Sequence, residues 1–403
     1  MTEDFEKINF LTENGSKDIN LRLKVDWFAF TVDEAKDFKN GKDFRILDFL
    51  GYSLSDFDEV SGKNFYNSGY TLKNFIKIFY NDPSKKITKG SSFTHNYIFT
   101  GVGCSNLQGH IKNDWVKLFR DLRDLFNVKF RRIDICLDDW NFPSLISFDY
   151  IRRKVEAGHF KSSKRQYHFI NDRSTTGDSL GASWYLGSRK TTGKLGHSML
   201  RVYKKAQQMI YAKKQLYALP QEVQLQSLDP NFKEYKWLRW EIEFTKEKAI
   251  SMIGLIVKFE NDGVKNPITK AFFQVLRGMI DFLVPTKDPK TGKIYKSKHQ
   301  WKSSEKWLSF LNHEDSVELE NPAQIYDLGS VHDWILYYVM PTIQMLQKIY
   351  ESCDLDFYDL MKQLPECDFS KKQESLLLET QGITKDELLV FASHFLNDRG
   401  GSH

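Results

Sequence analysis

Apolar and polar residues alternate along several short segments in the first two thirds of the chain, which is the period of half-buried strands. The strands predicted from this alternation lie at 25–31, 96–100, 129–138, 166–170, 182–188, 198–204 and 236–245, with a hairpin at 64–82. Apolar spacing of three and four residues predicts helices at 110–126, 148–157, 204–216 and 247–258. Two glycines in TGVGC at 100–104 predict a tight turn after the strand at 96–100.

After about residue 262 the pattern becomes helical throughout. The expected helices lie at 268–284, 301–312, 330–351, 354–363, 371–379 and 384–396. We therefore predict an α+β fold, with an antiparallel-sheet catalytic domain at 21–262 and flanking helices. A tail at 1–20 precedes it, and a helical domain at 263–399, a candidate for DNA binding or dimerisation, follows it. Residues 400–403 resemble a linker running into an affinity tag.

The charge balance permits a polyanionic partner without requiring one. The chain has 58 Lys and Arg against 53 Asp and Glu, a formal net charge of +5. The basic residues concentrate at 152–165, 189–205 and 287–306. The four cysteines form no C-x-x-C pair, which argues against a disulfide framework or a zinc site. An acidic first segment and the absence of any long apolar run predict a soluble, cytoplasmic protein with no membrane contact.

Three of the predicted strands place charged residues on one face. Residues two apart in a strand share a face, so Arg132, Asp134 and Asp138 of the strand at 131–139 point the same way. The other two strands add further polar residues in the same manner, namely Arg239, Glu241 and Glu243 at 238–245, and Arg201 and Tyr203 at 199–204. If these strands are neighbours, four carboxylates, three arginines and a tyrosine line one surface.

Such a surface has two interpretations that spacing alone leaves open. Clustered carboxylates suit a hard cation such as Mg²⁺ or Mn²⁺, which would polarise a phosphodiester. Tyr203 is then a candidate nucleophile. Its ordinary pKa is near 10, and Arg201, Lys204 and Lys205 would help to lower it. The alternative is a surface ladder of ion pairs without catalysis. Tyr211, eight residues further on, is a rival nucleophile or a packing residue.

Five segments of the chain resemble, in order, the replication initiation factor family, which comprises rolling-circle plasmid initiators and related nicking enzymes of conjugative elements. RRIDICLDD resembles the family's R-x-D-x-x-x-D strand, and LRWEIEF its R-x-E-x-E strand. VDWFAFT resembles the opening strand, FTGVGC the S-G-x-G-C turn, and WYLGSRKTTGKLGHSMLRVYKK the Y-x-G-S-R-K…L-R-x-Y-x-K hairpin. The tail, with Trp301, Trp307 and 334–347, also resembles the family's helical end.

This resemblance implies a site-specific strand transferase that depends on Mg²⁺ or Mn²⁺. It implies Tyr203 as the nucleophile that forms a 5′-phosphotyrosine, with Arg201 and Lys204 acting beside it. The implied metal ligands are Asp134, Asp138 and Glu241, with Glu243 as an addition. The expected DNA contacts are Arg189, Lys190, Lys205, Arg132 and Arg239. The insert at 193–198 lengthens the hairpin before Tyr203 and leaves its register open.

The partners implied are a double-stranded origin with an exposed single-stranded nick site, a host helicase and a second copy of the chain. We expect origin recognition towards the C-terminal part, with the basic loop at 285–306 as the candidate. A relaxase of an integrative conjugative element would use the same chemistry. A nuclease that activates water would leave no covalent adduct, and a non-catalytic DNA-binding regulator would be indifferent to Mg²⁺ and to Tyr203.

Overall fold

The computed structural model consists of two compact units, Met1–Pro322 and Ala323–His403. The residues that the structure describes are 6–7, 21–33, 37–39, 43–63, 65–82, 84–85, 94–139, 144–173, 175–176, 179–187, 197–205, 237–312, 314, 319, 335, 339–352 and 355–362. Residues 206–216 of the expected helix at 204–216 and the two expected helices beyond residue 370 lie outside these ranges, while Lys204 is the last residue of the strand Ser198–Lys204.

The first unit is built around one antiparallel sheet, which has eleven strands among the described residues. Its order is β11-β12-β13-β14-β9-β2-β8-β7-β6-β5, and β1 pairs with β2 beside this path. The strands are β1 (Glu6–Lys7), β2 (Leu21–Asp33), β5 (Asp58–Ser61), β6 (Ser68–Leu72), β7 (Ile76–Tyr80), β8 (Thr94–Phe99), β9 (Lys129–Asp139), β11 (Tyr167–Arg173), β12 (Ser179–Leu186), β13 (Ser198–Lys204) and β14 (Leu238–Thr245).

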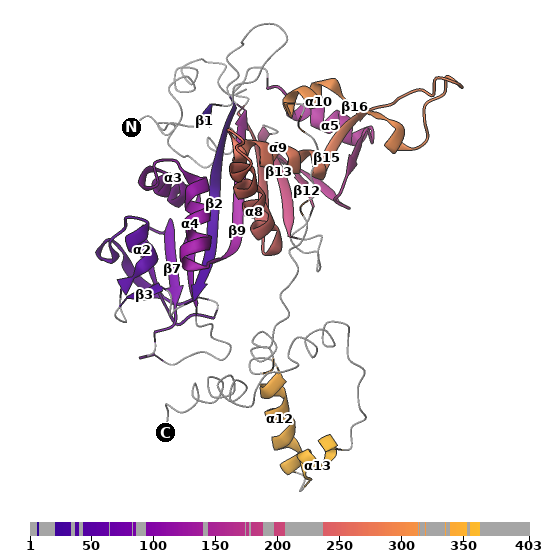
Figure 1. Ribbon diagram of the computed structural model, residues 1–403. Helices are drawn as coiled ribbons and strands as arrows, with labels where there is room; N and C mark the ends of the chain where they lie inside the picture. The colour runs from indigo at the N-terminus through magenta and orange to yellow at the C-terminus, as the bar shows by residue number, and fades with distance from the viewer. Residues whose placement is uncertain are drawn as a thin grey trace. The chain divides into compact units, whose positions relative to one another are not determined.

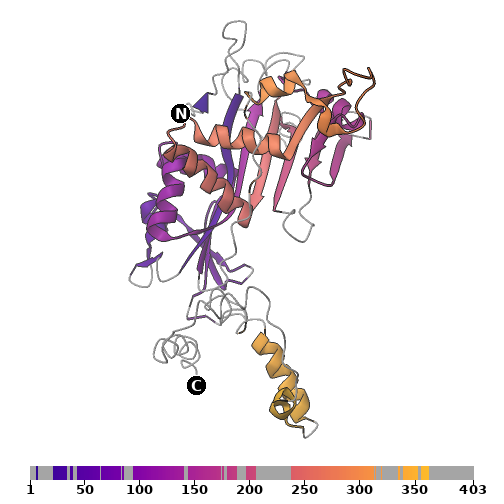
Figure 2. The same cartoon turned by 45° about the vertical axis from the view of Figure 1, so that its right-hand side comes forward.

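Helices cover one face of this sheet, as Figures 1 and 2 show. They are α4 (Trp115–Phe126), α8 (Glu247–Asn261) and α9 (Pro267–Met279), whereas α3 (Gly101–His110) begins next to Asp26 of β2. Their apolar sides share one buried core with the apolar sides of the strands, to which Ile135, Trp240 and Val202 belong. The α+β fold predicted from the alternation is confirmed. The polar residues of β9, β13 and β14 consequently face away from this core.

Aromatic side chains fill the core where α4 meets the centre of the sheet. Phe28 of β2 lies 5.5 Å from the Phe119 ring and 5.9 Å from the Trp115 ring, centroid to centroid. These distances are typical of tilted and edge-on aromatic packing. The helix itself begins at the Asp114 cap, whose carboxylate accepts from the Lys117 amide, and ends at Asn127 in the left-handed region. The caps therefore define where α4 begins and ends, and its aromatic contacts hold it against the sheet.

The segment TGVGC, predicted to form a tight turn, instead begins helix α3. Its glycines serve close packing and not a left-handed backbone. A Cβ on Gly103 would lie 2.3 Å from the carbonyl oxygen of Phe75, and one on Gly101 would lie 3.1 Å from a carboxylate oxygen of Asp26. The prediction was wrong because glycine signals both turns and close backbone contacts, and here the helix start lies directly against neighbouring strands.

Several smaller elements complete the first unit. A second sheet has the order β10-β15-β16, and β3 pairs with β4. The elements are β3 (Phe38–Lys39), β4 (Asp43–Phe44), α2 (Arg45–Phe49), η1 (Leu54–Asp56), α5 (Phe148–Glu156), β10 (Phe160–Ser162), β15 (Ile280–Val284), η4 (Lys298–Gln300), β16 (Lys302–Ser303) and α10 (Glu305–Phe310). The expected helix at 268–284 is therefore shorter, because its last five residues form β15 and pair with β10 and β16.

The first compact unit extends well beyond the boundary at 262 that the sequence predicts. Trp307 of α10 shows the reason, because its side chain is fully buried among core residues of the sheet domain. Its ring lies 5.7 Å from Trp240 of β14 and 4.9 Å from Phe282 of β15. Helical periodicity after residue 262 thus marks helices that belong to the first unit as well as those of the second.

The second unit contains α12 (Met340–Glu351) and α13 (Phe357–Lys362) among its described residues. Both are helical, as the pattern of apolar residues predicts. Throughout the described part of the chain, no helix combines the length and apolar character needed to cross a membrane.

We predict that Trp307→Ala lowers the free energy of unfolding of the first unit by about 3–5 kcal/mol, because it removes a buried indole and leaves a cavity. Urea unfolding of the full chain followed by circular dichroism measures this. Ile294→Ala, at a side chain that is 53% exposed, should change it by less than about 0.5 kcal/mol. A loss below about 1 kcal/mol for Trp307→Ala would contradict the placement of α10 in the core.

Candidate active site

The polar face of the central sheet brings the charged residues of β9, β13 and β14 into register. The strands are direct neighbours in the order β13-β14-β9. The facing pairs are Arg201 with Glu241, Tyr203 with Arg239, Glu243 with Asp134, and Arg239 with Asp138. Opposite charges face each other at two of these four positions, whereas Glu243 faces the like-charged Asp134. The strand adjacency that the sequence hypothesis requires is therefore present.

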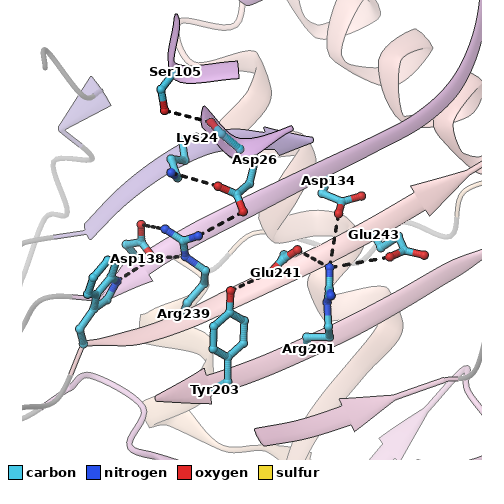
Figure 3. A network of polar contacts seen from close by, with 12 residues as sticks. Lys24, Asp26, Ser105, Asp134, Asp138, Arg201, Tyr203, Arg239, Glu241 and Glu243 are labelled. Carbon is cyan, nitrogen blue, oxygen red and sulfur yellow. Dashed lines mark hydrogen bonds and ion pairs between the residues drawn. The ribbon is translucent and has the colours of Figure 1, made fainter. Parts of the chain in front are cut away.

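Asp134, Glu241 and Glu243 form what we call the carboxylate cluster. Their exposed fractions are only 2%, 4% and 5%. The guanidinium of Arg201 lies between them, as Figure 3 shows. Its Nη2 donates to Asp134 at 3.3 Å and to Glu241, and lies 3.7 Å from Glu243. Arg132 holds the cluster from the other side, with Nη2 2.6 Å from Asp134 and 3.0 Å from Glu243.

The carboxylate cluster carries more negative charge than its arginines neutralise. Three carboxylates meet two guanidiniums, so one negative charge is left over when all are ionised. Burial, together with the nearby Glu241 and Glu243, raises the pKa of Asp134 to about 7 although Arg132 opposes the shift. A raised carboxyl pKa expresses the cost of a third buried negative charge. The cluster therefore has the electrostatic character of a site that attracts a further cation.

Asp138 belongs to a separate group, which we call the Arg239 cluster. Arg239 forms a two-pronged contact with Asp138 through Nε at 2.6 Å and Nη2 at 2.7 Å. Its Nη1 donates to Asp26 at 3.2 Å, and the indole of Trp237 donates to Asp138 at 2.8 Å. Lys24 completes the group with an ion pair to Asp26 at 3.0 Å. Asp138 is thus directed to Arg239, whereas the other three predicted ligands surround Arg201 (Figure 3).

Lys24 and Asp26 were not identified from the sequence, and a β-bulge explains why. Between Val25 and Trp27 the register of β2 against β9 shifts by one residue. The core-facing positions accordingly change from odd to even numbers, with Val25 before the shift and Phe28 after it. A bulge redirects side chains in this way. The signal available in the sequence was this break in alternation, which places Trp27 on the polar face, where Arg132 lies 4.5 Å above its ring.

Tyr203 lies on the polar face between the two clusters. Its hydroxyl donates to Oε2 of Glu241 at 2.9 Å, while Oε1 of the same carboxylate accepts from Arg201. Burial is the largest effect on the pKa of Tyr203, which lies well above its ordinary value, and the negative charge of Glu241 adds to the increase. The tyrosine is therefore protonated in this arrangement and points at a carboxylate that can accept its proton.

Basic residues adjoin Tyr203 at the end of β13. The ammonium of Lys205 lies 5.5 Å from the centre of the Tyr203 ring. Burial and the nearby Arg239 lower the pKa of Lys205 to about 8, although Asp26 and Asp138 act in the opposite direction. Lys204 is half-buried and pairs with the core residue Leu238, so it lies on the face of β13 opposite to Tyr203. The expected DNA contacts Arg189 and Lys190, and the rival nucleophile Tyr211, lie outside the described residues.

The chemistry of the carboxylate cluster fits a divalent cation, although no ready-made metal site is present. Among the described residues, no group of three or more His, Cys, Asp or Glu is arranged to hold a metal ion. The three carboxylates of the cluster instead converge on one nitrogen of Arg201. That nitrogen stands in for a cation, and oxygen ligands of this kind are those that Mg²⁺ and Mn²⁺ prefer.

Comparison with known proteins agrees with the geometry. A model of the replication initiation factor family matches residues 128–364, more than half of the chain. The fold is similar to a solved rolling circle replication initiator protein from Geobacillus stearothermophilus, with a TM-score of 0.55 and 20% sequence identity over 75% of this chain and 99% of that one. No curated protein matches the sequence.

The matched region begins directly before β9 and includes every residue of the carboxylate cluster as well as Tyr203. The resemblance found in the ordered motifs is thereby confirmed. A role in starting DNA replication, with DNA as the partner, follows at the level of the family. The chain belongs to the replication initiation factor family.

Proposed function

We propose that this protein initiates rolling-circle replication by nicking one DNA strand at an origin and later rejoining it through Tyr203. The contact between the Tyr203 hydroxyl and Glu241, at 2.9 Å, is the observation that carries the proposal. It connects a nucleophile to a buried cluster of carboxylates suited to a divalent cation. A ladder of ion pairs that served only stability would not need to surround one arginine with three acids beside a tyrosine.

In the proposed reaction, the Tyr203 oxygen attacks the phosphorus of one phosphodiester and displaces the 3′-oxygen of the preceding nucleotide. Glu241 accepts the hydroxyl proton, and the departing oxygen takes a proton from solvent. The products are a 5′-phosphotyrosine and a free 3′-hydroxyl. Because the phosphotyrosyl ester conserves the energy of the broken bond, the reverse attack rejoins the strand without a nucleotide cofactor.

Divalent metal is the proposed cofactor, with Asp134, Glu241 and Glu243 as its ligands. When bound, Mg²⁺ or Mn²⁺ would polarise the phosphate and neutralise its developing charge. The geometry favours these three residues over Asp138, because Asp138 is directed to Arg239. We assign Asp138 instead to the support of Arg239.

The basic residues divide into two roles under this proposal. Arg201 and Lys205 lie next to Tyr203 and would contact the phosphates of the strand to be cut, whereas Lys204 lies on the opposite face of β13. Arg189 and Lys190 remain candidates through the family motif. Arg132 and Arg239 hold buried carboxylates, and all three side-chain nitrogens of Arg239 are engaged in this way.

The free 3′-hydroxyl left by the cut would prime DNA synthesis. A helicase would have to separate the two strands for this synthesis to proceed.

The first prediction concerns the nucleophile. Tyr203→Phe should reduce the covalent protein–DNA adduct by about 10³-fold or more, because the attacking oxygen is missing. The assay uses plasmid carrying the DNA that flanks this gene, with Mn²⁺, and a denaturing gel. Tyr167→Phe, at an exposed tyrosine of β11, is the matched control and should form the adduct normally. An adduct formed by Tyr203→Phe would remove Tyr203 from the role.

The second prediction concerns the metal. Glu241→Gln and Asp134→Asn should each lower Mn²⁺-dependent nicking by about 10²-fold or more, since each removes a charged ligand without changing size. Chelation with EDTA should abolish nicking by the unmodified chain, whereas binding to duplex DNA persists. Glu156→Gln, at an exposed position of α5, is the control. Unchanged nicking in both cluster variants would reassign these acids to an ion-pair ladder.

The third prediction separates the role of Arg239 from DNA binding. Arg239→Gln should lower the free energy of unfolding by about 3–5 kcal/mol, because Asp138 and Asp26 lose their main cationic partner. Thermal or urea unfolding of the full chain measures this. Arg153→Gln, at an exposed arginine of α5, should leave stability nearly unchanged. A stable Arg239→Gln protein with weakened DNA binding would contradict the structural role.

A further inference from the structure

The three arginines on the polar face are held in two different ways. Arg132 and Arg239 each present two nitrogens, Nε and Nη2, to the two oxygens of a single carboxylate. The four distances lie between 2.6 and 2.8 Å. This two-pronged geometry is the strong and specific form of an arginine–carboxylate contact. Both side chains are therefore firmly fixed parts of the face.

Arg201 is held differently, because its contacts to the carboxylate cluster run through Nη2 alone. That atom serves Asp134, Glu241 and Glu243. The Nε–H of Arg201 is buried and has no hydrogen-bond partner within the described part of the chain. A buried donor without a partner costs about 1–3 kcal/mol. Arg201 thus places one guanidinium nitrogen at the centre of the cluster, and it does not use the Nε–H for a two-pronged contact.

We propose that Arg201 is a placeholder for the divalent cation, and that a bound cation displaces it toward a phosphate of the DNA strand at Tyr203. This inference rests on the proposed function and deepens it. The charges support the exchange. The charges of the three carboxylates and Arg132 sum to −2. With Arg201 in the cluster the net charge is −1, whereas with a divalent cation in its place the net charge is zero. With the cation bound, the positive charge of Arg201 is surplus to the cluster.

The position of Arg201 on β13 determines where the displaced guanidinium acts. It lies two residues from Tyr203 on the same face of the strand, a backbone separation of roughly 7 Å. The long side chain spans that distance and presents its unused Nε and a terminal nitrogen to two phosphate oxygens. Metal binding and strand binding are consequently coupled, since each favours the displaced position of Arg201.

The test measures Mn²⁺ affinity by titration followed by electron paramagnetic resonance, and the affinity for a fluorescent single-stranded oligonucleotide with and without Mn²⁺. In Arg201→Gln we expect Mn²⁺ to bind about 5- to 150-fold more tightly than in the unmodified chain, because no guanidinium competes for the cluster. In the unmodified chain, Mn²⁺ should strengthen oligonucleotide binding by a factor in the same range. Arg201→Gln should lose that coupling.

Two matched variants separate the placeholder from a general charge effect. Arg132→Gln removes the same charge from the same cluster but leaves Arg201 competing for the cation position, so it should tighten Mn²⁺ binding less than Arg201→Gln does. Arg123→Gln removes the charge from an exposed position on α4 and should change neither affinity. Arg201→Lys keeps the charge without the two-pronged group. It should bind Mn²⁺ about as tightly as the unmodified chain, but with weaker coupling between Mn²⁺ and the oligonucleotide. This variant tests the proposal if Arg201→Gln does not fold.

Unchanged or weaker Mn²⁺ binding in a folded Arg201→Gln protein would overturn the placeholder. Full coupling in Arg201→Gln or Arg201→Lys would do the same. These failures differ from a failure of the proposed function. Mn²⁺-dependent nicking with unchanged affinity in Arg201→Gln overturns this inference alone. Absence of Mn²⁺ binding in every variant overturns both this inference and the metal part of the proposal.

Discussion

Four carboxylates are buried on the polar face of the central sheet, those of Asp134, Asp138, Glu241 and Glu243. A buried carboxylate is tolerated only when a cation or several donors compensate its charge. The antiparallel register meets this demand by placing arginines opposite acids on neighbouring strands. The arrangement of every other group on this face, including the tyrosine, follows from how these four charges are compensated.

The compensation is complete in one half of the face and incomplete in the other. In the Arg239 cluster, three cationic or neutral donor side chains serve two carboxylates, and Arg239 is itself buried. In the carboxylate cluster, three acids share two arginines, one of them held by a single nitrogen. A fully compensated group is rigid and supports the fold. An incompletely compensated group is a place for a cation, and Glu241 connects it to Tyr203.

Much of this face could be predicted from the sequence because it depends on strand periodicity. Arg132, Asp134, Arg239, Glu241, Glu243, Arg201 and Tyr203 all lie on the side that simple alternation assigns to them. Separation along the strand could not be judged in the same way. Asp138 shares the face with Asp134, yet three residues of β9 separate them, and Arg239 opposite Asp138 directs that carboxylate away from the other three.

Other features depend on tertiary contacts that no local pattern reports. The bulge at Asp26 changes which residues of β2 face the polar side, and only the partner strand β9 reveals it. The glycines of TGVGC serve packing against Phe75 and Asp26, so a turn was the wrong prediction. Likewise, the helical periodicity of 305–310 does not reveal that Trp307 packs against the sheet of the first unit.

The central claim is that the carboxylate cluster is a cation site next to the nucleophile. Anomalous diffraction from crystals grown with Mn²⁺ tests it most directly. The account predicts one strong peak at about 2.0–2.3 Å from oxygens of Asp134, Glu241 and Glu243, with the Arg201 guanidinium outside the cluster. A peak bound by Asp138 and not by these three residues, or Arg201 still at the centre of the cluster with no peak at saturating Mn²⁺, would contradict it.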